Sequence, residues 1–225
     1  MTATTYALDE GIATITIDDG RVNALSTELS TEIAAQFARA EEDGALVVLT
    51  GRGTTLSAGF DIRCPPEGWP EMVTTGAKLS ERILQHPHPV VVACNGSAIA
   101  MGAFLLLSGD LRIGAIGDFK IGLNEVAIGL TLPWFGVQLA RHRLTRPYSD
   151  RCPVTGVVLG PEEAVTAGCL DRLVPQEEVL SAATAAAREL AAVNRDAHHA
   201  TKLRVREPLL TGMRDAIEQM ERGEW

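Results

Sequence analysis

The sequence predicts an α/β fold, and the order of its apolar patterns is the main reason. Short segments rich in β-branched residues recur along the first two thirds of the chain, and one of them, at 45–50, follows a helical pattern that ends near Glu42. The order strand, helix, strand favours parallel pairing of the strands. Helical patterns dominate the last third, so we expect a mixed core followed by a helical part.

The N-terminal elements can be placed from their turn and cap residues. Strands are expected at 4–8 and 12–17, joined by the turn Asp9-Glu10-Gly11. Ser26 is expected to cap the helix that follows and runs to about Glu42. The buried stripe of this helix is predicted from apolar residues at helical spacing, which are Leu29, Ile33, Phe37 and Ala40.

The segment 51–62 begins with Gly-x-Gly but fits neither of the nucleotide-binding patterns that it suggests. It lacks the third glycine of a dinucleotide fingerprint and the Gly-Lys-Ser/Thr end of a phosphate loop. The segment 64–70 holds three prolines and is expected to be a loop. A helix is predicted at 71–85, and prolines end it before a buried strand at 90–94.

The centre of the chain is a strand, a small-residue loop and an apolar helix. The turn pair Asn95-Gly96 follows the strand, and a helix is expected from Met101 through Leu107. The first N–H groups of such a helix have no partners within it and lie at the positive end of its dipole. They can hold an anion or a developing oxyanion. The commoner alternative is that small residues here only allow close packing.

The remaining elements follow from proline and glycine signals. We expect a strand at 111–116, a helix at 134–143, and a short helix that Pro161 opens and Gly168 ends. An alanine-rich helix is predicted at 176–193. Two further helices are predicted, one starting at Asp196 and one at Gly212.

Composition excludes several classes of protein. The 225 residues are 46% hydrophobic, with a net charge of −9 and an isoelectric point near 5.1, which argues against nucleic acid or an anionic membrane as a partner. We expect no signal peptide, and no span of about twenty apolar residues that would cross a membrane. The four cysteines are scattered and form no Cys-x-x-Cys pair, which indicates free thiols in a reducing cytoplasm.

Few side chains are candidates for chemistry from their sequence context alone. The histidines 142, 198 and 199 have no carboxylate or cysteine cluster at ligand spacing, so we expect no metal. Ser57 and Ser108 lack the Gly-x-Ser-x-Gly elbow of serine hydrolases. Glu125 lies among apolar residues, which would raise its pKa and suit a general acid/base. A surface position is the alternative for this glutamate.

Four motifs in order resemble those of the crotonase (enoyl-CoA hydratase/isomerase) superfamily, over nearly the whole chain. Asn23-Ala24-Leu25-Ser26 is similar to the first acyl-CoA-contacting segment of that family. Residues 57–62 match its Ser-Ala-Gly-x-Asp-Leu motif, and 95–102 match its Asn-Gly-x-Ala-x-Gly-Gly-Gly loop. Residues 162–175 are similar to its Ala-x-x-x-Gly-Leu-Val-Asp-x-Val-Val-Pro segment.

The resemblance implies a fold and an assembly. The family fold is a spiral of ββα units with a helical C-terminal part. We therefore expect a spiral core with the acyl-CoA site at 1–158 and a helical trimerisation region at 159–225. The resemblance also implies a homotrimer or hexamer. It implies no cofactor other than the coenzyme A that forms part of the substrate.

The resemblance also implies roles for particular residues. The backbone N–H groups of Phe60 and Met101 would form an oxyanion hole for the thioester carbonyl. Phe104 and Trp134 would line the acyl pocket. Coenzyme A and the acyl thioester would lie against the motif segments, whose expected contact residues are Val22, Ala24, Leu25, Ala58, Asp61, Ile62 and Asn124.

The predicted reaction depends on the acid/base groups. Hydratases of the family use two glutamates, and the first of these positions holds Phe104 here while the second holds Glu125. The resemblance is therefore strongest to the enoyl-CoA isomerase branch, which carries one glutamate within Gly-Leu-Asn-Glu. It implies conversion of a 3-enoyl-CoA to the trans-2-enoyl-CoA. The alternatives are a weak hydratase, a thioester hydrolase, and an acyl-CoA-binding protein without turnover.

Overall fold

The computed structural model describes residues 2–224 and confirms the α/β class. Its main sheet has the strand order β1-β2-β4-β7-β9-β12. β1 is antiparallel to β2, and the other neighbours in this sheet are parallel. The six strands are β1 (Thr4–Asp9), β2 (Ile12–Ile17), β4 (Leu46–Gly51), β7 (Val90–Cys94), β9 (Leu111–Ala115) and β12 (Arg172–Val174).

Two smaller sheets lie in segments that were predicted to be loops or for which no element was predicted. The order of the first is β11-β10-β8-β5, and the second pairs β3 with β6. These strands are two or three residues long, so they carry no readable alternation of apolar and polar residues. They are β3 (Ala24–Leu25), β5 (Thr55–Ser57), β6 (Gly59–Phe60), β8 (Ser97–Ile99), β10 (Ile121–Gly122) and β11 (Val158–Leu159).

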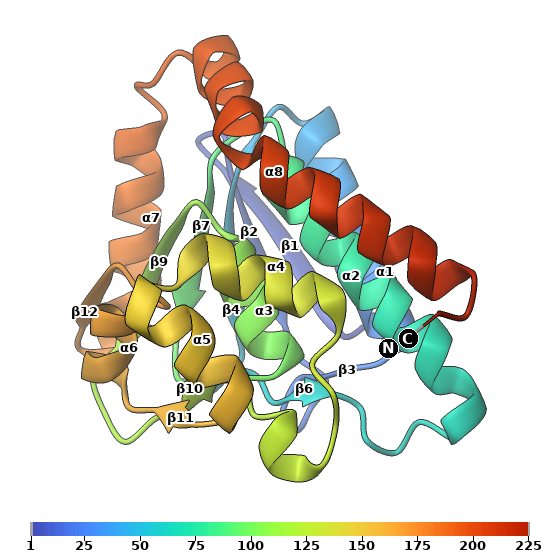
Figure 1. Ribbon diagram of the computed structural model, residues 1–225. Helices are drawn as coiled ribbons and strands as arrows, with labels where there is room; N and C mark the ends of the chain where they lie inside the picture. The colour runs from blue at the N-terminus through green and yellow to red at the C-terminus, as the bar shows by residue number, and fades with distance from the viewer. Residues whose placement is uncertain (1, 225) are drawn as a thin grey trace.

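The chain passes repeatedly through the same three layers, which confirms the predicted spiral of ββα units. β4 in the main sheet is followed by β5 in the small sheet and then by α2 (Trp69–Gln85). β7 and β8 lead in the same way to α3 (Met101–Ser108), and β9 and β10 to α4 (Trp134–Arg143). Figure 1 shows these helices in front of the main sheet.

The other helices are α1 (Thr27–Glu42), α5 (Arg146–Thr155), α6 (Pro161–Ala167), α7 (Val179–Leu190) and α8 (Arg195–Glu221), with short 3₁₀ turns η1 (Pro66–Gly68), η2 (Val126–Ile128) and η3 (Gln176–Glu178). The predicted cap of α1 is confirmed, because the Leu29 N–H donates to Ser26 Oγ at 3.2 Å. Its predicted apolar stripe is buried. Within residues 2–224, no helix combines the length and the apolar character that a membrane crossing needs.

Several predicted boundaries in the C-terminal part were wrong. The helices expected from Asp196 and from Gly212 are one continuous helix, α8, which accommodates Pro208. α5 was not predicted, and the helix expected at 176–193 is η3 followed by the shorter α7. β12 belongs to the main sheet although it lies in the region expected to be helical. The division of the chain at residue 158 stays a prediction.

The main sheet is covered on both faces. The side chains of β4 point alternately to the two faces of the sheet, because successive residues of a strand point to opposite sides. Leu46 and Val48 pack in a small apolar cluster with Ala183 and Ala187 of α7. The intervening side chains join the larger core, which also contains residues of α1, α2, α3 and α8.

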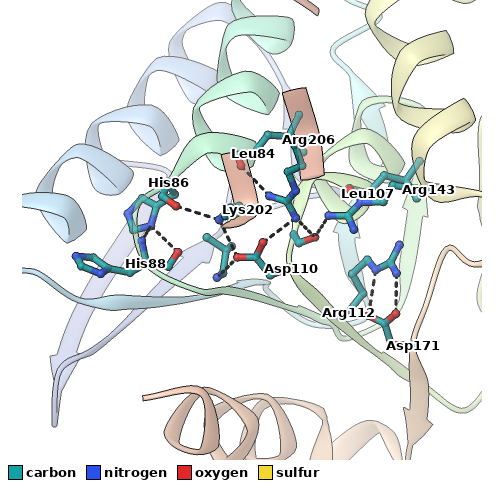
Figure 2. A network of polar contacts seen from close by, with 12 residues as sticks. Leu84, His86, His88, Leu107, Asp110, Arg112, Arg143, Asp171, Lys202 and Arg206 are labelled. Carbon is teal, nitrogen blue, oxygen red and sulfur yellow. Dashed lines mark hydrogen bonds and ion pairs between the residues drawn. The ribbon is translucent and has the colours of Figure 1, made fainter. Parts of the chain in front are cut away.

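A buried polar network fixes α8 to the rest of the core (Figure 2). Asp110 follows α3, and its carboxylate lies 2.8 Å from Lys202 Nζ and 2.7 Å from Arg206 Nη2, both from α8. The same cations donate to carbonyls at the C-terminal end of α2, Lys202 to His86 at 3.0 Å and Arg206 to Leu84 at 2.7 Å. Burial opposes the charge of Asp110, but the two cations hold its pKa below the usual value.

Candidate active site

Three loops meet at one edge of the small sheet. β5, β8 and β10 are parallel neighbours, so their carboxyl ends lie on the same side. Open parallel sheets commonly place their binding sites beyond this edge. β5 leads to Phe60, β8 to Met101, and β10 to Glu125. The fold thus brings together the three residues for which the sequence predicts catalytic roles.

Gly59 allows the first two loops to approach closely. Its φ of +105° lies in the region that favours glycine, and a Cβ atom at this position would come within 2.9 Å of Ala100 Cβ and 3.6 Å of the Met101 backbone nitrogen. The Asp61 N–H donates to the Leu25 carbonyl. Whether the Phe60 N–H points toward a ligand stays a prediction.

The N-terminus of α3 supplies the second predicted donor. Met101 is the first residue of this buried helix, where N–H groups lack partners within the helix and the dipole is positive. The preceding residue, Ala100, has φ 49° and ψ −118°, a conformation that favours glycine and costs a residue with a Cβ atom about 1–3 kcal/mol. The surroundings therefore hold the entry to this helix in a strained conformation, a feature typical of functional sites.

Glu125 is a buried carboxylate without a partner. It is 6% exposed, and neither of its carboxylate oxygens has a hydrogen-bond donor among residues 2–224. Its backbone is fixed, because its carbonyl accepts from the N–H groups of Ile128 at 3.1 Å and Leu130 at 2.9 Å. Burial raises the pKa of Glu125 from 4.5 to about 7. Such a group can take up and release a proton near neutral pH.

Glu125 lies on the wall of an apolar cleft of about 1070 Å³. Of the other residues with predicted site roles, Phe60 and Trp134 line the same cleft. Trp134 is 54% exposed and therefore lies toward the mouth. The remaining wall comes from elements far apart in sequence and includes Pro66, Trp69, Val73, Val126, Leu132, Val137, Pro153 and Met220.

Phe104 does not line the cleft, although the resemblance implied a place for it in the acyl pocket. It is fully buried, and its ring packs edge-on against Phe135 with centroids 4.9 Å apart. The Met101 side chain is also buried, which leaves the backbone as its means of contact with a ligand. Asn124 is half-buried, and its Oδ1 has no donor within the described chain.

The apolar residues close to Glu125 in sequence fall into two groups. Leu123 and Phe135 are buried in the core. Val126 and Leu130 line the cleft and are more than 40% exposed. The apolar surroundings of this carboxylate are therefore open on one side, toward the cleft.

The two segments with predicted coenzyme A contacts lie side by side. β3 pairs with β6, the Ala58 N–H donates to the Val22 carbonyl at 3.0 Å, and Asp61 donates to Leu25 at the same distance. The Val22 and Ile62 side chains are 50% and 78% exposed. Whether these segments hold coenzyme A stays a prediction.

Asp19 and Asn23 shape the first of these segments. The sequence motif included Asn23, but neither side chain was predicted to hold the turn. The Asp19 carboxylate accepts from the N–H groups of Arg21, Asn23 and Ala24 at 2.7 to 2.9 Å. Asn23, at φ 55°, donates from Nδ2 to the Thr55 carbonyl at 2.9 Å. The signal available in the sequence was the run Asp-Asp-Gly-Arg-Val-Asn, because Asp, Asn and Gly favour such turns.

Comparison with known proteins settles the family. The model of the enoyl-CoA hydratase/isomerase family matches residues 7–222. This chain belongs to the enoyl-CoA hydratase/isomerase family. Human mitochondrial enoyl-CoA delta isomerase 1 is similar to this chain. The two are 30% identical over an alignment of 220 positions that covers 93% of this chain and 73% of the human protein.

Solved structures of the family have the same fold. An enoyl-CoA hydratase/isomerase family protein from Pseudomonas syringae is 43% identical, with a TM-score of 0.96 and coverage of 99% of this chain and 98% of that one. An enoyl-CoA hydratase from Mycobacterium marinum is 38% identical, with a TM-score of 0.94 and coverage of 98% of each chain. The crotonase fold expected from the motifs is thereby confirmed. The relatives carry the names of both reactions, isomerisation and hydration.

Proposed function

We propose that this family member isomerises 3-enoyl-CoA thioesters to trans-2-enoyl-CoA thioesters. The observation that carries the proposal is Glu125, a buried carboxylate on the wall of an apolar cleft that has no hydrogen-bond donor among residues 2–224. Its pKa of about 7 makes both protonation states available at neutral pH. A single group of this kind can remove a proton from one carbon and return it to another.

The reaction moves one proton and one double bond. Glu125 takes the proton from C2, and the electron pair of the broken C–H bond delocalises onto the thioester oxygen as an enolate. The N–H groups of Phe60 and Met101 stabilise the negative charge on that oxygen. The protonated Glu125 then delivers the proton to C4. The double bond moves from C3–C4 to C2–C3, and the composition of the substrate does not change.

The surroundings of Phe104 favour isomerisation over hydration. Efficient addition of water to a double bond in this family uses a second carboxylate, and Phe104 occupies its place in the sequence. Phe104 is fully buried against Phe135, so neither water nor substrate contacts it. Among the described residues of the cleft wall, the other acidic residue is Glu224. It forms an exposed ion pair with Arg222, with 3.3 Å between Glu224 Oε2 and Arg222 Nη2.

The experiment that tests the proposal compares the wild type with Glu125→Gln on 3-hexenoyl-CoA. Gln keeps the shape of the side chain and cannot act as a base, so turnover should fall by roughly two to four orders of magnitude. Binding of hexanoyl-CoA, measured by calorimetry, should stay nearly unchanged. Product analysis needs NMR as well as mass spectrometry, because an isomerisation does not change mass. Near wild-type turnover in the variant would show that Glu125 is not the base.

A panel of substrates separates the alternative functions. Hydration of crotonyl-CoA should be slow, and release of free thiol from acyl-CoA should not exceed the uncatalysed rate. Robust turnover in either assay would replace isomerisation by the corresponding reaction. Tight binding of every acyl-CoA without conversion of any would identify a binding protein without turnover.

A further inference from the structure

The cleft beside Glu125 is large for a short acyl group. Its volume is about 1070 Å³, and pockets that enclose drug-sized ligands typically measure roughly 300–1,000 Å³. A group of two to four carbons would leave most of this apolar wall in contact with water. A longer chain would cover it, which is favourable in proportion to the apolar area removed from water.

The wall also indicates the charge of the occupant. Trp69, Val73 and Met220 are apolar, and the ionisable side chains among its described residues are Glu125 and Glu224. Both are acidic, so the wall offers no cation to a second carboxylate on the acyl chain. A dicarboxylic acyl group would bring a like charge into this cleft at an electrostatic cost.

A buried glycine lies behind the wall of the cleft. Gly76, in the middle of α2, is buried and is not part of the wall itself. A Cβ atom at this position would lie 2.7 Å from Phe60 Cε1 and 3.1 Å from Met101 Sδ. The Phe60 ring, which lines the cleft, therefore packs directly onto the bare backbone of α2. Trp69 packs edge-on against the same ring at 6.5 Å and limits its sideways movement.

We propose that the cleft binds long, uncharged acyl chains and that Gly76 determines its width. A side chain at position 76 would push the Phe60 ring away from α2 and into the cleft. The space lost would be taken from the acyl chain, so long chains would suffer more than short ones. This inference rests on the proposed function, because it takes an acyl-CoA as the ligand.

The wild-type protein tests the first half of the proposal. Saturated acyl-CoAs with acyl chains of four, eight and twelve carbons are titrated by calorimetry below their micelle concentrations. Each added methylene should tighten binding by about fourfold until the chain fills the cleft. Decanoyl-CoA should bind more tightly than the analogue with a terminal carboxylate. Equal affinities along the series, or a preference for the dicarboxylic analogue, would overturn the inference.

Gly76→Ala tests the second half. The ratio of the affinities for dodecanoyl-CoA and butyryl-CoA should fall at least fourfold, the value of one buried methylene. Val73→Phe narrows the cleft from the same helix and should lower the same ratio of affinities. This second variant tests the width of the cleft if Gly76→Ala does not fold. Gly160→Ala is the matched control, because a Cβ atom there meets nothing within 4 Å. An unchanged ratio in folded Gly76→Ala would refute the role of this glycine.

These binding measurements test the inference separately from the proposed function. Saturated acyl-CoAs have no double bond to move, so their binding does not depend on the chemistry of Glu125. Isomerisation without any dependence on chain length would refute the inference and leave the function standing. A steep chain-length series without isomerisation would do the reverse.

Discussion

Glu125 links the chemistry of the site to the stability of the fold. Burial raises its pKa from 4.5 to about 7, whereas the unfolded chain leaves the carboxyl in water. Between these two values the folded protein holds a proton that the unfolded chain releases. This contribution to stability is therefore complete below about pH 4.5 and is lost as the pH rises through about 7.

The variant Glu125→Gln isolates this effect, because it does not titrate and all other ionisable groups are shared with the wild type. The difference in unfolding free energy between the two proteins should move in favour of the variant between pH 5 and pH 8. The expected movement is at most about 3 kcal/mol, because the part of the interval between pKa 4.5 and about 7 that lies above pH 5 spans about two pH units, each worth about 1.4 kcal/mol. Urea unfolding at both pH values measures it, and an identical difference at pH 5 and pH 8 would contradict the buried, unpaired carboxylate.

At the scale of single residues, the sequence predicted the surroundings of Glu125 but not those of Phe104. The place of Glu125 in an apolar segment was enough to predict a raised pKa, which its burial supports. Sequence could not show that Phe104 faces Phe135 instead of the cleft, because a helix that is apolar on every side has no readable inner face. The role of Gly76 depends on Phe60, which is distant in the chain, so no local pattern could reveal it.

At the scale of elements, α8 is fixed by charge as well as by apolar packing. Asp110→Asn keeps the size of the side chain and an acceptor for the Val90 N–H, but leaves Lys202 and Arg206 buried without their counter-ion. Breaking a buried ion pair in this way costs about 3–5 kcal/mol, so urea unfolding of the variant should show a loss in that range.

The control for this prediction is Glu221→Gln. The Lys78–Glu221 pair also joins α2 to α8, but its side chains are 53% and 48% exposed. Such surface pairs contribute about 0–1 kcal/mol. Equal losses in Asp110→Asn and Glu221→Gln would show that burial of the network does not stabilise the docking of α8.

Elements were predictable where they are long enough to show a period. The 16 residues of α1 carry a cap and an apolar stripe that the structure confirms. β5, β8 and β10 were missed, because two or three residues show no alternation and their pairing depends on strands elsewhere in the chain. Gly212 suggested that a separate last helix begins there, yet α8 continues through this glycine. Leu209 and Leu210 before it and Met213 after it are buried, and their packing outweighs the low helix propensity of glycine.

At the scale of the whole molecule, the family fold predicts a trimer or hexamer. Exposed apolar residues of the C-terminal part are candidates for the contact, and Val205 of α8 is 64% exposed. Light scattering should give three or six times the 24.0 kDa of one chain. Val205→Glu should shift the mass toward that of a single chain, because it would bury a charge in the contact.

Leu8→Glu is the control for this substitution, since Leu8 is 48% exposed on β1, at the N-terminal edge of the main sheet. It should leave the mass unchanged. A wild-type mass of 24.0 kDa would contradict the assembly itself. A trimer that tolerates Val205→Glu would place the contact elsewhere on the surface.

The course of α8 has a consequence for the time during which the protein is made. Trp69 and Met220 face the same cleft but lie about 150 residues apart, a distance that a ribosome covers on the order of ten seconds. Throughout this interval the N-terminal end of α2 exists without the wall that Met220 supplies. The growing chain therefore exposes apolar residues of this wall to chaperones and to neighbouring nascent chains until the helix that carries Met220 has left the exit tunnel.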